Sequence, residues 1–132
     1  WQGGSEADGR SIPRNAAGRP RLSDPADART LYRAAFQEFA AGRVDAAIAG
    51  YRKAIEADPD YALAWNGLSI AYRNQGELDS AIEAALRLVE IEPEDPLSHT
   101  NLSILYQQKG MIAEAEDAAA RASQLQAPTE SN

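Results

Sequence analysis

The side chains that most often carry chemistry in proteins are sparse in this sequence. The chain has one histidine, His99, and no cysteine, so a zinc site of His and Cys ligands is not available. Two acidic clusters lie at 90–95 and 114–117, but such clusters are more typical of a solvated helix face than of a cation site. We therefore expect no catalytic residue, no metal and no cofactor.

Three glycines recur at a fixed interval. Gly42, Gly76 and Gly110 are spaced by 34 residues, and Pro59 and Pro93 share that spacing. The same interval separates further residues of one type: Ala47, Ala81 and Ala115; Leu68 and Leu102; Tyr72 and Tyr106. Isolated glycines of this kind end helices and do not cradle a phosphate. The period predicts tandem repeats, with units at about 28–61, 62–95 and 96–129.

Each unit contains two helical patterns with a glycine between them. The predicted helices span about 25–41, 45–58, 61–75, 79–92, 95–109 and 113–126. Asp24 and Asp95 each precede a proline, an order typical of an N-cap followed by the first helical residue. Asp45 and Asp79 lie at the start of second helices, where the helix dipole favours negative charge. The sequence therefore predicts an all-α fold of three helix-turn-helix repeats.

Charge is distributed unevenly along the chain. Residues 1–23 hold four arginines against Glu6 and Asp8, a net charge of +2, whereas nine basic and eighteen acidic side chains give residues 24–132 a net charge of −9. So acidic a domain repels phosphate backbones and anionic membrane surfaces. We expect neither a nucleic-acid partner nor direct membrane contact.

The two ends differ in composition from the repeats. Residues 1–23 are rich in Gly and Pro and are expected to be disordered, and 128–132 to form a frayed end, which leaves 24–127 as the repeat domain. Residues 1–5 look like a cloning scar or the start of an excised fragment, so any targeting signal would have been removed. The cytoplasm is favoured as the compartment, the periplasm stays open, and a fragment of a larger protein stays an alternative.

The repeats resemble the tetratricopeptide repeat family in their order of large and small residues. Unit two carries the pattern most fully, with Trp65, Leu68, Ser69, Tyr72, Ala81, Ala85 and Pro93. Unit three has His99 at the position of Trp65, which favours a packing role for this histidine, and unit one is the most divergent. The resemblance covers about 100 of 132 residues. It implies a right-handed αα superhelix, or solenoid, that acts as a scaffold for protein–protein interaction and not as an enzyme.

In the family that the repeats resemble, set positions of each first helix line a concave groove. Mapped onto this chain they are Tyr32, Phe36, Phe39 and Ala40 in unit one, Leu63, Asn66, Ile70, Arg73 and Asn74 in unit two, and Leu97, Thr100, Ile104, Gln107 and Gln108 in unit three. The groove is apolar at one end and rich in amides at the other, which suits a peptide or helix with apolar anchors. As an alternative, Phe36 and Phe39 belong to the core, covered by residues 1–23 or by a partner subunit.

Two further expectations concern the partner. Some family members clamp a C-terminal carboxylate, but the corresponding positions here offer no lysine or arginine: Tyr32, Phe36, Gly67, Leu97 and Asn101. We therefore expect a protein or peptide partner of another kind. The main alternative is a self-assembling module that forms a homo-oligomer through the small residues of helix 113–126, Ala115, Ala118, Ala119 and Ala122.

Overall fold

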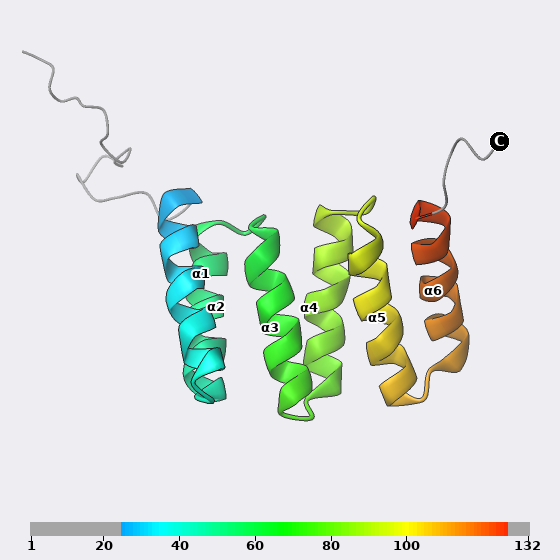
Figure 1. The fold of residues 1–132 in the computed structure, drawn as a ribbon, viewed down its shortest axis with the longest axis horizontal. Helices are drawn as coiled ribbons and strands as arrows, with labels where there is room; N and C mark the ends of the chain where they lie inside the picture. The colour runs from blue at the N-terminus through cyan, green and yellow to red at the C-terminus, as the bar shows by residue number, and fades with distance from the viewer. Residues whose placement is uncertain (1–24, 127–132) are drawn as a thin grey trace, which may run out of the picture.

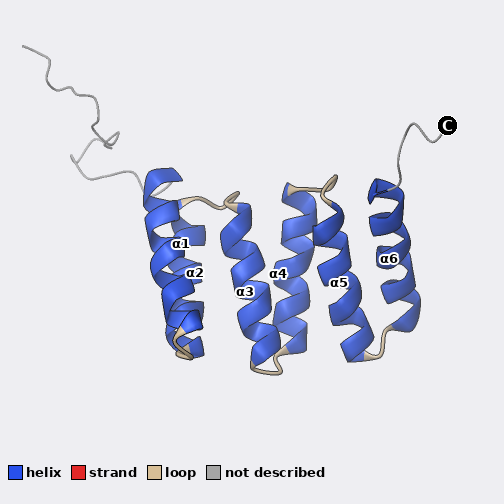
Figure 2. Ribbon diagram, in the orientation of Figure 1, coloured by secondary structure: helices blue, strands red, loops and turns tan. Residues whose placement is uncertain are grey.

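The computed structural model describes residues 25–126, which form six α-helices and no strand (Figures 1 and 2). The helices are α1 (Pro25–Ala40), α2 (Val44–Ala57), α3 (Ala62–Asn74), α4 (Leu78–Ile91), α5 (Pro96–Lys109) and α6 (Ile112–Gln126). Every helix predicted from the sequence is present, and each observed end lies within one residue of the predicted one. Three predictions lie outside the described residues, namely those for 1–23, for the Asp24 N-cap and for 128–132.

The three glycines end the first helix of each unit, as predicted. Gly42, Gly76 and Gly110 have φ of 87°, 81° and 87°, a left-handed conformation in which a side chain would be strained. In each turn the residue after the glycine donates its N–H to the carbonyl five residues back: Arg43 to Glu38 at 2.9 Å, Glu77 to Tyr72 at 2.9 Å and Met111 to Tyr106 at 2.8 Å. A Cβ at these glycines would meet no heavy atom within 4 Å. Backbone conformation, and not lack of space, therefore requires glycine.

Acidic residues open the helices where the sequence predicts them. The Asp95 carboxylate accepts a hydrogen bond from the backbone N–H of Leu97 at 3.0 Å, and Pro96 follows the cap as the first residue of α5. Asp45 and Asp79 lie in the first turns of α2 and α4, near the positive end of each helix dipole. The Asp95 prediction is thus confirmed by a bond, and the other two by position.

Successive helices pack side by side along the array. The contacts are most extensive within a unit, between α1 and α2, α3 and α4, and α5 and α6, and the second helix of one unit then packs on the first helix of the next. Across the first unit boundary α1 also contacts α3, whereas α2 and α4 are farther apart. In the first two units the first helices therefore lie on the inner side of the array and the second helices on the outer side, and a hydrogen bond from Asn101 on α5 to Asn66 on α3 continues this order into the third unit.

Small residues allow this close approach, and larger ones fill the spaces between helices. One core cluster joins α1 to α4 around Tyr51 and Leu68, with Ala35, Ala47, Ala71 and Ala84. A second joins α4 to α6 around Leu102 and Leu105, with Ala81, Ile82, Ala85 and Ala118. Ala119 is exposed on α6, although Tyr51 and Ala85 at the equivalent positions are buried. The difference arises because no described helix packs on that side of α6.

Polar contacts recur with the period of the repeat. The buried Ser69 hydroxyl donates to the Ala81 carbonyl at 3.1 Å, and one repeat later Ser103 donates to Ala115 at 2.8 Å. Each bond ties the first helix of a unit to its second helix. In unit one the equivalent position is Ala35, so that unit lacks the bond.

Two other contacts also repeat after 34 residues. The Trp65 indole N–H donates to the Pro59 carbonyl at 2.8 Å, and His99 Nε2 lies 2.8 Å from the Pro93 carbonyl. His99 is 8% exposed, so its packing role is confirmed. The exposed pairs Gln75–Asp45 and Lys109–Asp79 also occupy equivalent positions, and each links the end of a first helix to the second helix of the preceding unit.

Candidate binding face on the first helices

All fourteen side chains predicted for the groove lie on α1, α3 and α5, and none of them is buried. They fall on one side of each helix because they recur at intervals of three, four and seven residues. Since α1, α3 and α5 lie on the inner side of the array, these side chains form a continuous inner face, which is the candidate site. The packing of the core leaves this face accessible.

Large apolar side chains are exposed along the inner face. Phe36 on α1 is 51% exposed, Leu63 on α3 is 50% exposed and Leu97 on α5 is 62% exposed. Among the described residues only two other large apolar side chains are exposed, Leu86 on α4 and Ile112 on α6. Apolar side chains gathered on one face usually mark a contact surface.

The aromatic end of the face divides between surface and core. Phe39 packs against the first core cluster, so the core interpretation holds for it within the monomer, whereas Phe36 projects outward. Tyr32 lies between the two environments, with ring centroids 6.2 Å from Phe36, 5.8 Å from Tyr51 and 5.9 Å from Tyr61. Partial burial, and then the neighbouring Tyr61, raise the pKa of Tyr32, which keeps the phenol neutral. The exposed Phe36 ring therefore contacts Tyr32, which is itself held by Tyr51 and Tyr61.

The amide end of the face is partly engaged. The Asn101 amide donates to the Asn66 carbonyl oxygen at 2.9 Å, a bond that joins α5 to α3 across the unit boundary. Asn74, Gln107 and Gln108 are exposed near the C-terminal ends of the same two helices. The sequence identified Asn66 as a groove residue but gave no sign that Asn101 would hold it. This bond fixes the spacing between two of the helices that form the face.

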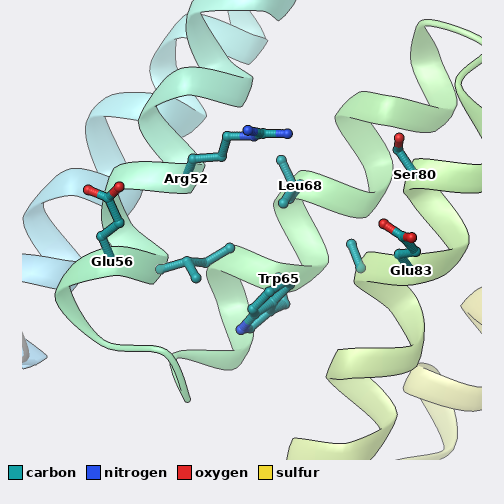
Figure 3. A pocket seen from close by; sticks show the side chains of 8 residues that line it. Arg52, Glu56, Trp65, Leu68, Ser80 and Glu83 are labelled. Atoms are coloured by element: carbon teal, nitrogen blue, oxygen red, sulfur yellow. The ribbon is translucent and has the colours of Figure 1, made fainter.

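A separate hollow of about 330 Å³ lies on the other side of α3, between α2 and α4 (Figure 3). Its lining side chains are Arg52, Ile55, Glu56, Trp65, Leu68, Ser80, Glu83 and Ala84. Arg52 is held there by the Tyr72 hydroxyl, and Arg87 lies 5.9 Å from the Trp65 ring centroid. No predicted site residue lines this hollow, because the sequence pattern assigns Trp65 and Leu68 to packing.

Two groups that suggested chemistry at first sight lie apart from the inner face. The acidic side chains at 90, 92, 94, 114, 116 and 117 are exposed, as the sequence predicts for a solvated surface. Between Pro25 and Gln126 no three His, Asp or Glu side chains are placed together to hold a metal ion. In the same stretch no helix is long and apolar enough to cross a membrane.

A model of the family described as tetratricopeptide repeat matches residues 37–96. Residues 37–96 are therefore tetratricopeptide repeats. Six helices in three pairs, with the glycine turns and serine bonds recurring every 34 residues, extend the same architecture over Pro25–Gln126. The tetratricopeptide repeat array therefore has the architecture of a protein-interaction scaffold. A search of curated proteins gives no match.

Solved structures agree with this assignment. MamA is 28% identical, with 77% of this chain and 60% of that chain covered and a TM-score of 0.73, so the chain spans less than two thirds of the MamA length. The first tetratricopeptide repeat domain of Spaghetti (RPAP3), solved with an HSP90 peptide, is 20% identical over 80% of this chain and 83% of that chain, with a TM-score of 0.76. SycD, the type III secretion translocator chaperone of Yersinia enterocolitica, is 23% identical over 76% of both chains, with a TM-score of 0.71. The last two likenesses support the fold alone.

Proposed function

We propose that the tetratricopeptide repeat array binds a peptide or helix of a partner protein along its inner face. The observation that carries the proposal is the exposure of Phe36, Leu63 and Leu97, one large apolar side chain from the first helix of each unit. A line of such anchors on a preformed surface suits an extended or helical segment with regularly spaced apolar side chains. The solved domain of Spaghetti shows that this fold can hold a peptide.

The inner face is also preorganised. Tyr32 is packed between Phe36, Tyr51 and Tyr61, and the Asn101–Asn66 bond joins α5 to α3. A partner would therefore order few groups of this chain on binding, which lowers the entropic cost of association. The exposed amides of Asn74, Gln107 and Gln108 are of a type that hydrogen-bonds to a peptide backbone.

A selection of random peptides displayed on phage tests the proposal. Peptides selected on the full chain are measured again with Phe36→Ser and with Leu63→Ser, which remove apolar surface without adding charge. Leu86→Ser is the matched control, because Leu86 is also exposed, at 40%, but lies on α4. We expect about a tenfold or larger loss of affinity for the two inner-face variants and no change for the control. Peptides that bind all three variants as tightly as the parent chain would rule out the inner face as the binding site.

Self-association is a second candidate, because α6 presents unpartnered surface at the end of the array. Of the four small residues predicted to form the interface, Ala115, Ala118 and Ala122 are buried within the array and only Ala119 is exposed. Ile112 on the same helix is 54% exposed. A second copy that packed there would bury the same positions that the next unit buries at α2 and α4. Light scattering over a range of concentrations tests this, and a molar mass that stays at the monomer value would remove the candidate.

A further inference from the structure

The inner face carries positive and neutral side chains although the domain as a whole is acidic. Residues 25–126 hold sixteen acidic and nine basic side chains. Eight of the sixteen lie on the second helices α2, α4 and α6, and none lies on α3 or α5. On α1 there are two, Asp27 in the first turn and Glu38, and the latter pairs with Arg43. Negative charge is therefore concentrated on the outer helices and the loops.

Arginines accompany the apolar anchors on the inner helices. Arg29 and Arg33 precede Phe36 by seven and three residues, so the three side chains share one face of α1. Arg73 follows Ile70 by three residues on α3 and lies in its last turn. Within residues 25–126 none of these three arginines forms an ion pair, and the same holds for Arg52, Lys53 and Arg121 on the outer helices. Arg43, Arg87 and Lys109, the last at the end of α5, each have a carboxylate partner.

We infer that the partner segment is acidic as well as apolar, with carboxylates beside its apolar anchors. The inference rests on the proposed function of the inner face and adds the chemistry of the partner. A guanidinium beside an apolar side chain pairs a carboxylate in two parallel hydrogen bonds while the apolar group is covered. A basic segment would instead place its cations against Arg29, Arg33 and Arg73 with no carboxylate nearby on α3 or α5.

Distant charge does not reverse this preference. The outer-helix carboxylates repel an acidic segment at long range, but ionic screening reduces such interactions beyond roughly 8 Å at physiological salt. Pairs formed in direct contact on the inner face are screened less. The arginines on the inner face therefore determine which charge the bound segment carries. The acidic outer helices disfavour unspecific binding of acidic chains elsewhere on the domain.

The hollow between α2 and α4 shows that the outer side of the array differs in charge from the inner face. Glu56 and Glu83 stand on its opposite walls, from α2 and α4, and Figure 3 shows them on either side of Trp65. An acidic segment in this hollow would meet two carboxylates and one guanidinium, that of Arg52, which the Tyr72 hydroxyl already engages. The outer helices thus disfavour the segment that the inner face prefers, which gives specificity for one side of the array.

The test uses the selected peptides and their neutral counterparts. We expect acidic residues to be enriched beside the apolar ones in the selected set, and replacement of Glu by Gln and Asp by Asn in a synthetic peptide to weaken binding about tenfold. The double variant Arg33→Gln/Arg73→Gln should abolish the difference between the acidic and neutral peptides. The matched double variant Lys53→Gln/Arg121→Gln, which removes two exposed positive charges from outer helices, should preserve it.

The outcomes separate the two proposals. If acidic and neutral peptides bind equally, and Phe36→Ser still weakens both, the inner face binds peptides but the inference about acidic partners is wrong. If peptides bind but Phe36→Ser and Leu63→Ser leave their affinity unchanged, the proposed function fails and the inference fails with it. Circular dichroism of each variant confirms that the helices are retained, and a selected set dominated by basic peptides would also overturn the inference.

Discussion

The approach of α2 to α3 depends on a missing side chain at Gly67. A Cβ built at this position would lie 2.5 Å from both Cε1 and Cζ of the Tyr51 ring, closer than real Cβ contacts allow. The ring cannot easily withdraw, because Tyr51 is 2% exposed and belongs to the first core cluster. One repeat later the equivalent positions hold Ala85 and Asn101, so a small residue on the second helix accompanies a larger one on the next first helix. Substitutions at Tyr51 and Gly67 are therefore expected to have coupled effects on the free energy of unfolding.

Gly67→Ala brings two opposing effects on the free energy of unfolding. Alanine in a helix interior stabilises by about 1 kcal/mol relative to glycine. Overpacking against a buried ring costs about 1–3 kcal/mol. We expect a net loss of about 1 kcal/mol in the parent chain. In a Tyr51→Leu background, which lacks the atoms that clash, the same substitution should stabilise by about 1 kcal/mol, a coupling of about 2 kcal/mol.

Urea unfolding followed by circular dichroism, on the parent, the two single variants and the double variant, measures this coupling. Ala49→Gly, at an exposed position within α2, supplies the helix-propensity difference in the same protein. A change of sign between the two backgrounds supports the structural reasoning. Equal destabilisation by Gly67→Ala in both backgrounds would show that the Tyr51 ring does not determine the cost.

Three other predictions concern stability. Ser69→Ala and Ser103→Ala should each cost about 1 kcal/mol in urea unfolding, because each leaves a buried carbonyl without its hydroxyl donor. Asp95→Ala should cost about 1 kcal/mol through loss of the cap on α5, and Asp95→Ser should restore most of it. Burial raises the pKa of Tyr32 and Tyr51 above the ordinary 10.0, so the folded protein holds these protons more tightly than the unfolded chain. Stability should thus be unaffected by these groups below pH 10 and fall as pH rises above it, and a melting temperature that rises there would contradict this.

The sequence predicts the helices well because their ends are set by local chemistry. Gly42, Gly76 and Gly110 end helices through a backbone conformation that glycine adopts easily, and Asp95 with Pro96 opens α5 by a cap next to it in the chain. These signals require no knowledge of distant contacts. The 34-residue interval then fixes which helices pair, because equivalent residues must meet equivalent neighbours.

The contacts between helices are harder to predict. The bonds from Ser69 to Ala81 and from Asn101 to Asn66 join residues 12 and 35 positions apart, and their geometry depends on how the helices cross. Phe36 and Phe39 differ for the same reason. Both are aromatic residues on α1, but only the rotation of α1 against α2 and α3 places Phe39 against the core and leaves Phe36 outside.

The second helices pack in the core and the inner face of the first helices contacts solvent, which explains why the sequence predicts the fold better than it predicts the partner. First helices cover α2 and α4 on both sides and α6 on one side, so Ala47, Ala81 and Ala115 must stay small for the array to form. The inner face of each first helix contacts mainly solvent, so packing places few demands on it, and residues as different as Tyr32, Asn66 and Thr100 occupy the same position in the three units. Side chains that do not pack in the core are free to contact a partner. On the inner helices these side chains include apolar groups and arginines, and α3 and α5 contain no acidic residue. Nothing in the packing keeps acidic residues away from the inner face of this acidic protein, so a binding role is the reason that remains. If the inner face had no such role, Ile70→Glu or Arg73→Glu would leave both the free energy of unfolding and the affinity for peptides unchanged.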